Sequence, residues 1–248
     1  MSSDLFSLIN TYRDVTLIKL QDRTLLVIAC DSAGGIGEKE MDAVKVSPYI
    51  LGRFTSRVSL MEIISINARP ISLSITICAE PHPTGDLILN GIMDELREIG
   101  LQDISFTIST EKNIKTVQTG LGVTCIGLCK DDNLLLGKVQ KGDKIYIAGI
   151  PKVGKEVNLN DPAIFDLKAL LKLKESKNVK EIIPVGSKGV LGELENFSIC
   201  NSLKYKFFNP LPIDIKKSAG PSTCAIIFSK DTLKSELEVP LYLIGEIE

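Results

Sequence analysis

Residues that could do chemistry are concentrated in one polar loop that follows a β-rich run ending at Cys30. The loop combines two aspartates, three glycines and a lysine, which are Asp31, Asp42, Gly34, Gly35, Gly37 and Lys39. Glycines let backbone N–H groups approach phosphate oxygens, a lysine adds positive charge, and aspartates offer oxygen ligands to Mg²⁺. The glycine spacing fits neither the Walker A loop, G-x-x-x-x-G-K-S/T, nor the Rossmann pattern G-x-G-x-x-G. Taken alone, the loop is compatible with a phosphate site or with a flexible turn between strands.

Two further acidic residues extend this pattern. Glu62 lies on a helical segment after the loop, and Glu111 stands in Ser-Thr-Glu-Lys-Asn (residues 109–113), just after a strand. Carboxylates that come together from separate elements are what a Mg²⁺–ATP site requires. The alternative interpretation makes Glu62 a solvated helix residue and Glu111 an acid near a helix N-terminus.

The strands and helices that would position these residues follow from hydrophobic periodicity and turn signals. A hairpin is predicted at residues 15–30, because two β-rich runs flank a polar triplet at residues 21–23. Ser47 as N-cap and Pro48 in the first turn predict the start of a long helix. The predicted strands are 15–20, 24–30, 41–46, 71–78, 104–108 and 116–128, and the predicted helices are 48–64 and 84–99. This order mixes hairpins with crossovers, so it predicts an α+β domain with helices on one face of a mixed sheet.

A domain boundary is predicted near Lys138 to Asp143, where polar turn clusters flank a short apolar segment. The first domain would then cover residues 1–138, and a smaller α/β domain would cover residues 139–248. In the second domain, strands are predicted at 144–150, 181–185, 202–207, 224–229 and 241–247, and helices at 162–173 and 187–200.

Charge and hydropathy point to a soluble cytoplasmic protein. Lys and Arg total 29 against 31 acidic residues, and this net charge of -2 gives no electrostatic reason to expect a nucleic acid or a membrane partner. The lysines between Lys168 and Lys180 have the spacing of a solvated helix face. The start at residues 1–6 lacks the features of a signal peptide, and no apolar run reaches the ~18 residues of a spanning helix.

The six cysteines favour reduced thiols over metal or disulfide chemistry. They form no C-x-x-C pair, and His82 is the single imidazole in the sequence. Neither a zinc site nor Cys–His catalysis is therefore expected.

The acidic and glycine-rich segments described above occur in the same order along the chain as in the aminoimidazole ribonucleotide synthetase superfamily, and nearly the whole chain resembles that superfamily. It also contains selenophosphate synthetase, thiamine monophosphate kinase and a hydrogenase maturation factor. That superfamily has an early acidic, glycine-rich loop, a helix that bears an acid and ends in Gly-Ala-x-Pro, and then an acidic turn. The corresponding segments here are residues 31–42, 62–70 and 109–111, and Thr-Gly-Leu-Gly-Val at 119–123 resembles the close of the first domain. Asn67 and Ile108 stand where the superfamily usually has glycine.

Within the superfamily, the sequence is most similar to the alpha-ribazole kinase family. The motifs that carry this similarity are Cys30-Asp31-Ser32-x-Gly34-Gly35-Ile36-Gly37-x-Lys39-Glu40-x-Asp42, Arg57-Val58-x-Leu60-Met61-Glu62, Pro83-Thr84-Gly85, Ser109-Thr110-Glu111-x-Asn113, Pro184-Val185-Gly186-Ser187-Lys188-Gly189 and Gly220-Pro221-Ser222-Thr223.

The resemblance implies a two-domain kinase that uses ATP and Mg²⁺. It implies that Mg²⁺ is held by four carboxylates, those of Asp31, Asp42, Glu62 and Glu111. The ATP phosphates would contact Gly34, Gly35, Gly37, Lys39, Thr110 and Asn113, with Asp31 and Lys39 as the catalytic residues. The acceptor would be the ribosyl 5′-hydroxyl of alpha-ribazole, which becomes alpha-ribazole 5′-phosphate in the assembly of the cobalamin lower ligand. A homodimer formed through the first-domain sheet is the expected unit.

Contacts to the small-molecule nucleoside are implied for two motifs of the second domain. They contain Ser187, Lys188, Ser222 and Thr223, which would close over phosphate or substrate. His82 would contact substrate or, as the favoured alternative, be an exposed loop histidine held between two prolines.

Two other functions remain open at this stage. One is a different ATP-using enzyme of the superfamily, which activates an amide or a carboxylate or acts like thiamine monophosphate kinase. The other is a non-catalytic nucleotide-binding scaffold, although clustered carboxylates repel one another unless a cation is present.

Overall fold

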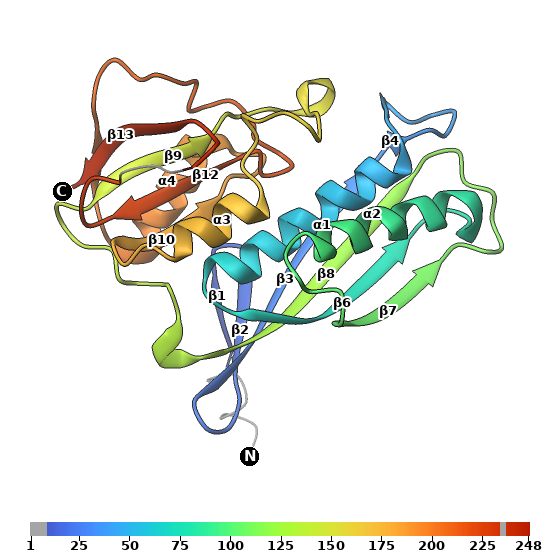
Figure 1. Cartoon of the computed structure of the whole chain (residues 1–248), viewed down its shortest axis with the longest axis horizontal. Helices are drawn as coiled ribbons and strands as arrows, with labels where there is room; N and C mark the ends of the chain where they lie inside the picture. Colours follow the sequence, from blue (N-terminus) through green and yellow to red (C-terminus); the bar gives the residue numbers. More distant parts are fainter. Residues whose placement is uncertain (1–8, 234–236) are drawn as a thin grey trace. The chain divides into compact units, whose positions relative to one another are not determined.

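The computed structural model describes residues 9–233 and 237–248, and they divide into two compact units. The first unit contains the chain up to Ile63 together with Ala68–Asp131, and the second contains Ile64–Asn67 together with Asp132–Glu248 (Figure 1). No helix in the described part of the chain is both long and apolar enough to cross a membrane. The expectation about a signal peptide concerned residues 1–6, which lie outside the described residues.

A six-stranded mixed sheet forms the body of the first unit. Its strand order is β1-β2-β3-β8-β6-β7, and among the described pairings within this sheet only β6–β7 is parallel. The strands are β1 (Ile9–Tyr12), β2 (Val15–Lys19), β3 (Thr24–Gly34), β8 (Gly120–Lys130), β6 (Arg69–Ile77) and β7 (Ser105–Thr110). The predicted hairpin is confirmed as the antiparallel β2–β3 pair, and the predicted α+β class with a mixed sheet is confirmed as well.

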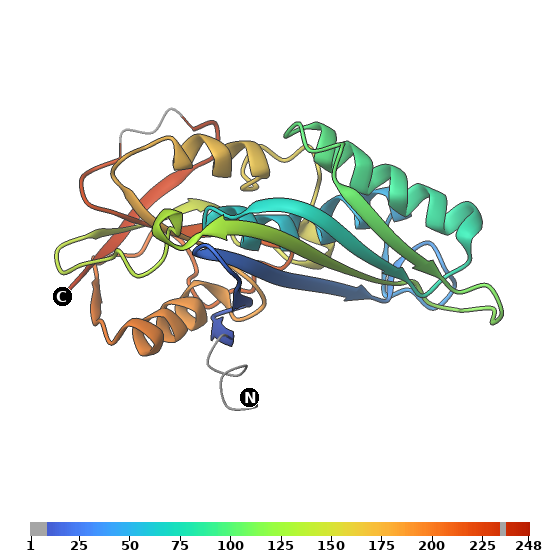
Figure 2. The same ribbon diagram turned by 90° about the horizontal axis from the view of Figure 1, so that it is seen from below.

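Helices α1 (Pro48–Ser65) and α2 (Asp86–Arg97) cover one face of this sheet (Figures 1 and 2). Buried and partly exposed residues alternate along β3, because successive strand side chains point to opposite faces. A Cβ built on Gly127 of β8 would lie 2.6 Å from Ile63 Cγ2, so α1 approaches the sheet closely at this point. By the same alternation, Asp31 shares the helix-covered face with Val27 and Ala29.

The two helices touch each other through their backbones. A Cβ on Gly52 of α1 would lie 2.2 Å from the Ile88 carbonyl oxygen, and one on Gly91 of α2 would lie 2.1 Å from the Tyr49 carbonyl oxygen. No side chain fits at either position, so the crossing of α1 and α2 requires both glycines.

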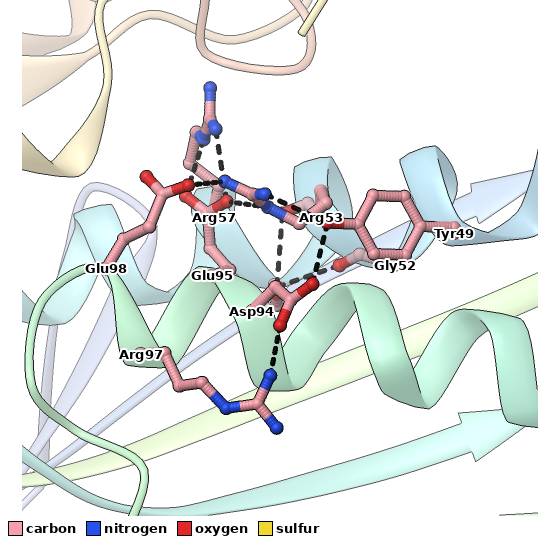
Figure 3. Close-up of polar contacts among 9 residues, drawn as sticks. Tyr49, Gly52, Arg53, Arg57, Asp94, Glu95, Arg97 and Glu98 are labelled. Carbon is pink, nitrogen blue, oxygen red and sulfur yellow. Dashed lines mark hydrogen bonds and ion pairs between the residues drawn. The ribbon is translucent and has the colours of Figure 1, made fainter.

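A buried ion network ties the same two helices together (Figure 3). The Glu95 carboxylate, 1% exposed, accepts hydrogen bonds from Arg53 Nε at 2.6 Å and from Arg57 Nε at 2.7 Å. Burial disfavours the charged guanidinium of Arg53, but the attraction of Glu95 outweighs burial and raises the pKa of Arg53. Tyr49 adds a hydrogen bond to Asp94 at 2.9 Å. The helix that carries Glu62 is therefore held in a fixed position on α2.

The strand expected at residues 41–46 is much shorter in the structure. Only β5 (Val44–Lys45) is a strand there, and it pairs in parallel with β4 (Ile36–Gly37). The prediction was wrong for residues 41 and 42 because Asp42 donates its backbone N–H to the Lys39 carbonyl and so belongs to a turn.

The turn after α1 explains one departure from the superfamily pattern. Asn67 adopts φ +69°, a left-handed conformation that suits glycine and that asparagine tolerates better than most residues. Its side-chain amide also donates to the Asn133 carbonyl at 2.9 Å. Ile108, the other departure, lies within β7 and is exposed.

The second unit is built on a five-stranded sheet in the order β10-β12-β9-β13-β11. It contains both helices and strands, as expected for the second domain, and every strand pairing described in it is antiparallel. Phe197 and Phe228 stack in its core with ring centroids 4.2 Å apart. The elements are β9 (Lys144–Gly149), α3 (Leu167–Lys174), β10 (Val179–Pro184), α4 (Gly189–Asn201), β11 (Tyr205–Phe207), β12 (Cys224–Ser229) and β13 (Leu241–Ile247).

Helix α3 begins later than the helix predicted at residues 162–173. Asp166 caps it by accepting a hydrogen bond from the Ala169 backbone N–H at 2.8 Å. Residues 162–165 instead form a turn, in which the Asp161 carboxylate accepts from the Ala163 N–H at 2.9 Å. Because Asp161 binds the backbone of this turn and Asp166 caps the helix, α3 begins at Leu167 and not at residue 162.

Candidate functional site

Three chain segments leave the first sheet at the same end. The register places Gly34, the last residue of β3, opposite Gly120 at the start of β8, and it places Ile77 beside Thr110 at the ends of β6 and β7. Strands β3, β6 and β7 run in one direction, so the segments that follow them, residues 35–47, 78–86 and 111–119, emerge together. We refer to this end of the sheet as the loop end. It holds most of the residues that the sequence singled out.

Asp42 organises the glycine-rich loop. Its buried carboxylate accepts hydrogen bonds from the backbone N–H of Lys39 at 2.8 Å, from the N–H of Thr119 at 2.7 Å and from the Thr119 hydroxyl at 2.8 Å. This carboxylate therefore joins the glycine-rich loop to the segment before β8. The predicted role of Asp42 as a Mg²⁺ ligand stays a prediction, and Thr119 is a partner that the sequence analysis missed.

The three glycines differ in what they offer a ligand. A Cβ on Gly34 would meet nothing within 4 Å, so the surface there is open. Gly35 has φ +69° and donates its N–H to the Thr119 carbonyl at 2.9 Å, so that amide already has a partner within the protein. A Cβ on Gly37 would lie 2.5 Å from the Thr119 hydroxyl oxygen, and this glycine is needed for packing. Of the three, Gly34 best fits the close approach of a phosphate.

Lys39 reaches across to the segment after β6, where it forms an ion pair with Glu80. The hydroxyl of Thr84 donates to the other carboxylate oxygen of Glu80. Burial opposes ionisation of Glu80, but the hydrogen bonds from Lys39 and Thr84 outweigh it and lower the pKa of the carboxyl. Sequence reasoning missed Glu80. Like Asp31, it is an acidic residue just after a predicted strand, and it precedes a proline-rich turn, so the same criterion could have identified it.

Asp31 is a partly buried carboxylate within β3, three residues before its end. Burial raises its pKa from 3.8 to about 6, and the hydrogen bond from the Ser32 backbone opposes this rise. Because a nearby cation would favour the ionised form, a carboxylate in this state is suited to holding a metal ion.

Glu111 begins the segment after β7. Its Oε1 accepts from the backbone N–H of Asn113 at 2.7 Å and of Ile114 at 3.0 Å, and these bonds lower the pKa of the carboxyl. Its own N–H donates to the Ala79 carbonyl at 3.0 Å, so Glu111 and the predicted phosphate contacts Thr110 and Asn113 lie at the loop end beside the segment of Glu80.

The four predicted Mg²⁺ ligands do not meet in one place. Across residues 9–233 and 237–248, no three His, Cys, Asp or Glu side chains form a group that could hold a metal ion. Asp31 and Glu111 are separated by β8 and β6, which at ordinary strand spacing is about 14 Å across the sheet. Mg²⁺ is commonly held by one or two carboxylates together with substrate phosphates, so Asp31 or Glu111 separately fits that chemistry.

Glu62 lies well along α1, about 21 Å from the helix start at 1.5 Å per residue. It is buried, so the alternative that it is a solvated helix residue was wrong. Glu62 is therefore well separated from the turn around Asp42. Its predicted role as a Mg²⁺ ligand stays a prediction.

The remaining predicted residues have simpler surroundings. His82 is exposed and contacts Asp86 through Nδ1 at 2.7 Å. In the second unit, Thr223 is buried, and its hydroxyl accepts from the Lys152 N–H at 2.8 Å. Ser222 is buried with φ 50°, and Ser187 and Lys188 precede α4. Their predicted contacts with substrate stay predictions.

Solved structures of known proteins share this fold. Thiamine-monophosphate kinase from Stenotrophomonas maltophilia K279a matches with a TM-score of 0.65 at 15% identity, over 97% of this chain and 88% of that one. AaThiL, determined in complex with AMPPCP and TMP, matches with a TM-score of 0.63 at 12% identity, over 95% and 84%. T. maritima PurL, determined in complex with ATP, matches with a TM-score of 0.61 at 16% identity.

The match to PurL covers 95% of this chain and 37% of PurL, so this chain spans little more than a third of that relative. No family model matches the sequence. No curated protein matches it either. The comparisons therefore establish that the chain has the PurM-like fold, the fold of aminoimidazole ribonucleotide synthetase.

Proposed function

We propose that this protein is an ATP-dependent, Mg²⁺-dependent kinase that phosphorylates the ribosyl 5′-hydroxyl of alpha-ribazole. The observation that carries the proposal is the loop end, where a glycine-rich loop, a paired lysine and the Thr110–Asn113 turn emerge together from one sheet. Two structures with the same fold were determined with ATP or AMPPCP, which supports nucleotide binding at a fold of this type.

In the proposed mechanism, the protein contributes position and charge. The open backbone at Gly34 would approach phosphate oxygens, and the Lys39 ammonium would donate to them. A bound Mg²⁺ would neutralise charge on the transferring phosphoryl group, held by Asp31 or Glu111 together with the phosphates. With a pKa of about 6, Asp31 is mostly ionised at neutral pH and can serve as such a ligand.

The choice of acceptor rests on the motifs that resemble alpha-ribazole kinases. Thiamine-monophosphate kinase shares the fold, so an activity of that kind is the second candidate. A nucleotide-binding scaffold without turnover is the third.

We also propose a homodimer through the first sheet. The face opposite α1 and α2 carries partly exposed apolar side chains from three neighbouring strands. They are Ile18, Leu26, Ile28, Ile126 and Leu128. Burying such a face against a second copy would remove apolar surface from water, which favours association. Sedimentation velocity of the wild type and of Ile28→Lys would test this, since a monomeric wild type contradicts it.

The kinase proposal is tested by incubating the protein with ATP, Mg²⁺ and alpha-ribazole, in parallel with thiamine monophosphate and aminoimidazole precursors. Mass spectrometry should show one added phosphate on alpha-ribazole alone, and Lys39→Met should abolish this product. Lys19→Met, at an exposed lysine in β2, is the matched control. A product from another acceptor would replace the substrate assignment, and ATP binding without any product would favour the scaffold.

A further inference from the structure

The lysine of the glycine-rich loop is not a mobile surface cation. Its side chain is 15% exposed, and its ammonium is paired with the Glu80 carboxylate, whose side chain is 38% exposed. The two residues are 41 positions apart in sequence and come from two different segments of the loop end. The pair therefore links the glycine-rich loop to the segment that follows β6.

Both partners of this pair stand on a fixed backbone. The Lys39 N–H donates to Asp42 Oδ2 at 2.8 Å, and the Lys39 carbonyl accepts from Asp42 N at 3.0 Å. The Glu80 carbonyl accepts from the Gly85 N–H at 3.1 Å, in the turn η2 (Pro81–Gly85). Thr84, in the same turn, holds the second carboxylate oxygen. Glu80 is thus oriented independently of Lys39.

An oriented carboxylate changes what the lysine can do. A free lysine side chain has four flexible carbon links, and holding its ammonium in one place costs conformational entropy. The ammonium has three donors, so a bond to Glu80 leaves others available to an anion. In protein kinases, a lysine that contacts ATP phosphates is likewise held by a glutamate from a separate element.

We propose that Glu80 is the positioning residue of Lys39, which it holds ready for the phosphates of the bound nucleotide. The proposal deepens the function proposed above and rests on it for the identity of the anion. The ion pair itself can be tested without any assumption about nucleotide.

The first test measures the reactivity of Lys39 towards trace acetic anhydride, read by peptide mass spectrometry in the absence of nucleotide. Glu80→Gln should raise the acetylation rate of Lys39 about three-fold or more, because the amine loses its ionic partner. The Lys144–Glu246 pair of the second unit is a matched control, since Glu246→Gln should raise the reactivity of Lys144 and leave Lys39 unchanged. An unchanged Lys39 rate in Glu80→Gln would overturn the proposal.

The second test measures ATP·Mg²⁺ binding by calorimetry. Glu80→Gln should weaken binding about five- to ten-fold, Glu80→Asp should restore part of the loss, and Glu246→Gln should have no effect. If Glu80→Gln binds ATP more tightly, Glu80 competes with phosphate and the proposal is wrong. If Lys39→Met binds ATP as well as the wild type does, the assignment of the loop as a phosphate site fails, whereas the labelling result still decides the role of Glu80.

A folding defect in Glu80→Gln would not leave the question open. Thr84→Val keeps both charges and removes only the hydroxyl that orients Glu80. It should raise the acetylation of Lys39 and weaken ATP binding by about two-fold each, with an unchanged melting temperature. No change in either measurement would show that Thr84 and Glu80 do not position the lysine.

Discussion

Replacing Asp31 by asparagine should make the protein more stable at alkaline pH and leave it nearly unchanged at acidic pH. Burial raises the pKa of the Asp31 carboxyl from 3.8 to about 6. Its favourable contribution to folding is therefore fully present below about pH 4 and is lost as the pH rises through 6, because ionisation is harder in the folded state than in the unfolded one. Asparagine has no charge to lose, so this dependence should disappear in the variant.

The size of the effect follows from the shift. A change of about two pKa units corresponds to roughly 3 kcal/mol at 1.36 kcal/mol per unit. Since Asp31 is partly exposed and solvent relaxes around it, we expect about 2 kcal/mol at pH 8. The hydrogen bond from the Ser32 backbone can be accepted by the asparagine carbonyl oxygen, so that contact should persist.

Urea unfolding at pH 3.5 and pH 8, without nucleotide or Mg²⁺, measures the protein close to both limits. Asp103→Asn is the control, because Asp103 is an exposed turn residue of the same unit. The reasoning is refuted if Asp31→Asn changes the free energy of unfolding equally at the two pH values, or if the variant is less stable at pH 8.

Three further predictions concern packing and reactivity. Glu95→Gln should lower the free energy of unfolding by about 3 kcal/mol, because it removes the negative charge that pairs with two buried arginines. Urea unfolding measures this, and a loss below about 1 kcal/mol would contradict a buried ion network. Gly91→Ala should lower the free energy of unfolding by about 2 kcal/mol or more, because a Cβ there would overlap the Tyr49 carbonyl oxygen. Gly100→Ala should lower it by about 1 kcal/mol, because a Cβ there meets nothing within 4 Å but φ is +69°. With a thiol reagent at pH 8, the exposed cysteines should react quickly and the buried ones only on unfolding. Burial raises the pKa of Cys125 to about 12 and also raises the pKa of Cys224, so these thiols are not ionised at pH 8. Fast labelling of Cys125 would contradict this prediction. The exposed cysteines are Cys30, Cys78 and Cys200, and the buried ones are Cys125, Cys129 and Cys224.

Elements with strong local signals were predictable from sequence. The start of α1 at Pro48 follows from the Ser47-Pro48 pair, and β12 and β13 coincide with their predicted ranges. Errors occurred where a side chain competed with the periodic pattern, as Asp166 does at the start of α3. Hydrophobic periodicity reports which face is buried, but a hydrogen bond to a nearby aspartate decides where an element begins.

The candidate site was only partly accessible to sequence reasoning. The composition of the glycine-rich loop pointed to an anion site, but the partner of Lys39 lies 41 residues away, and the pairing of β3 and β6 with β8 brings the two segments to the same end of the sheet. Thr119 escaped notice for the same reason, because its bonds to Asp42 join residues 77 positions apart. Equally, nothing local distinguishes a carboxylate that binds a metal from one that organises a turn.

The route of the chain between the two compact units limits how this protein can be divided. Residues 64–67 group with the second unit although they are the last two residues of α1 and the two that follow it, so the polypeptide passes from one unit to the other at 63/64, 67/68 and 131/132. The Leu135 N–H donates to the Ile66 carbonyl at 3.1 Å, which ties this short excursion to the start of the second unit. A single cut after Asp131 would therefore give an N-terminal fragment that carries a four-residue piece of its neighbour and a C-terminal fragment that lacks it. Gene fusions or domain exchanges within this fold should accordingly treat the turn at Asn67 as part of what is being exchanged.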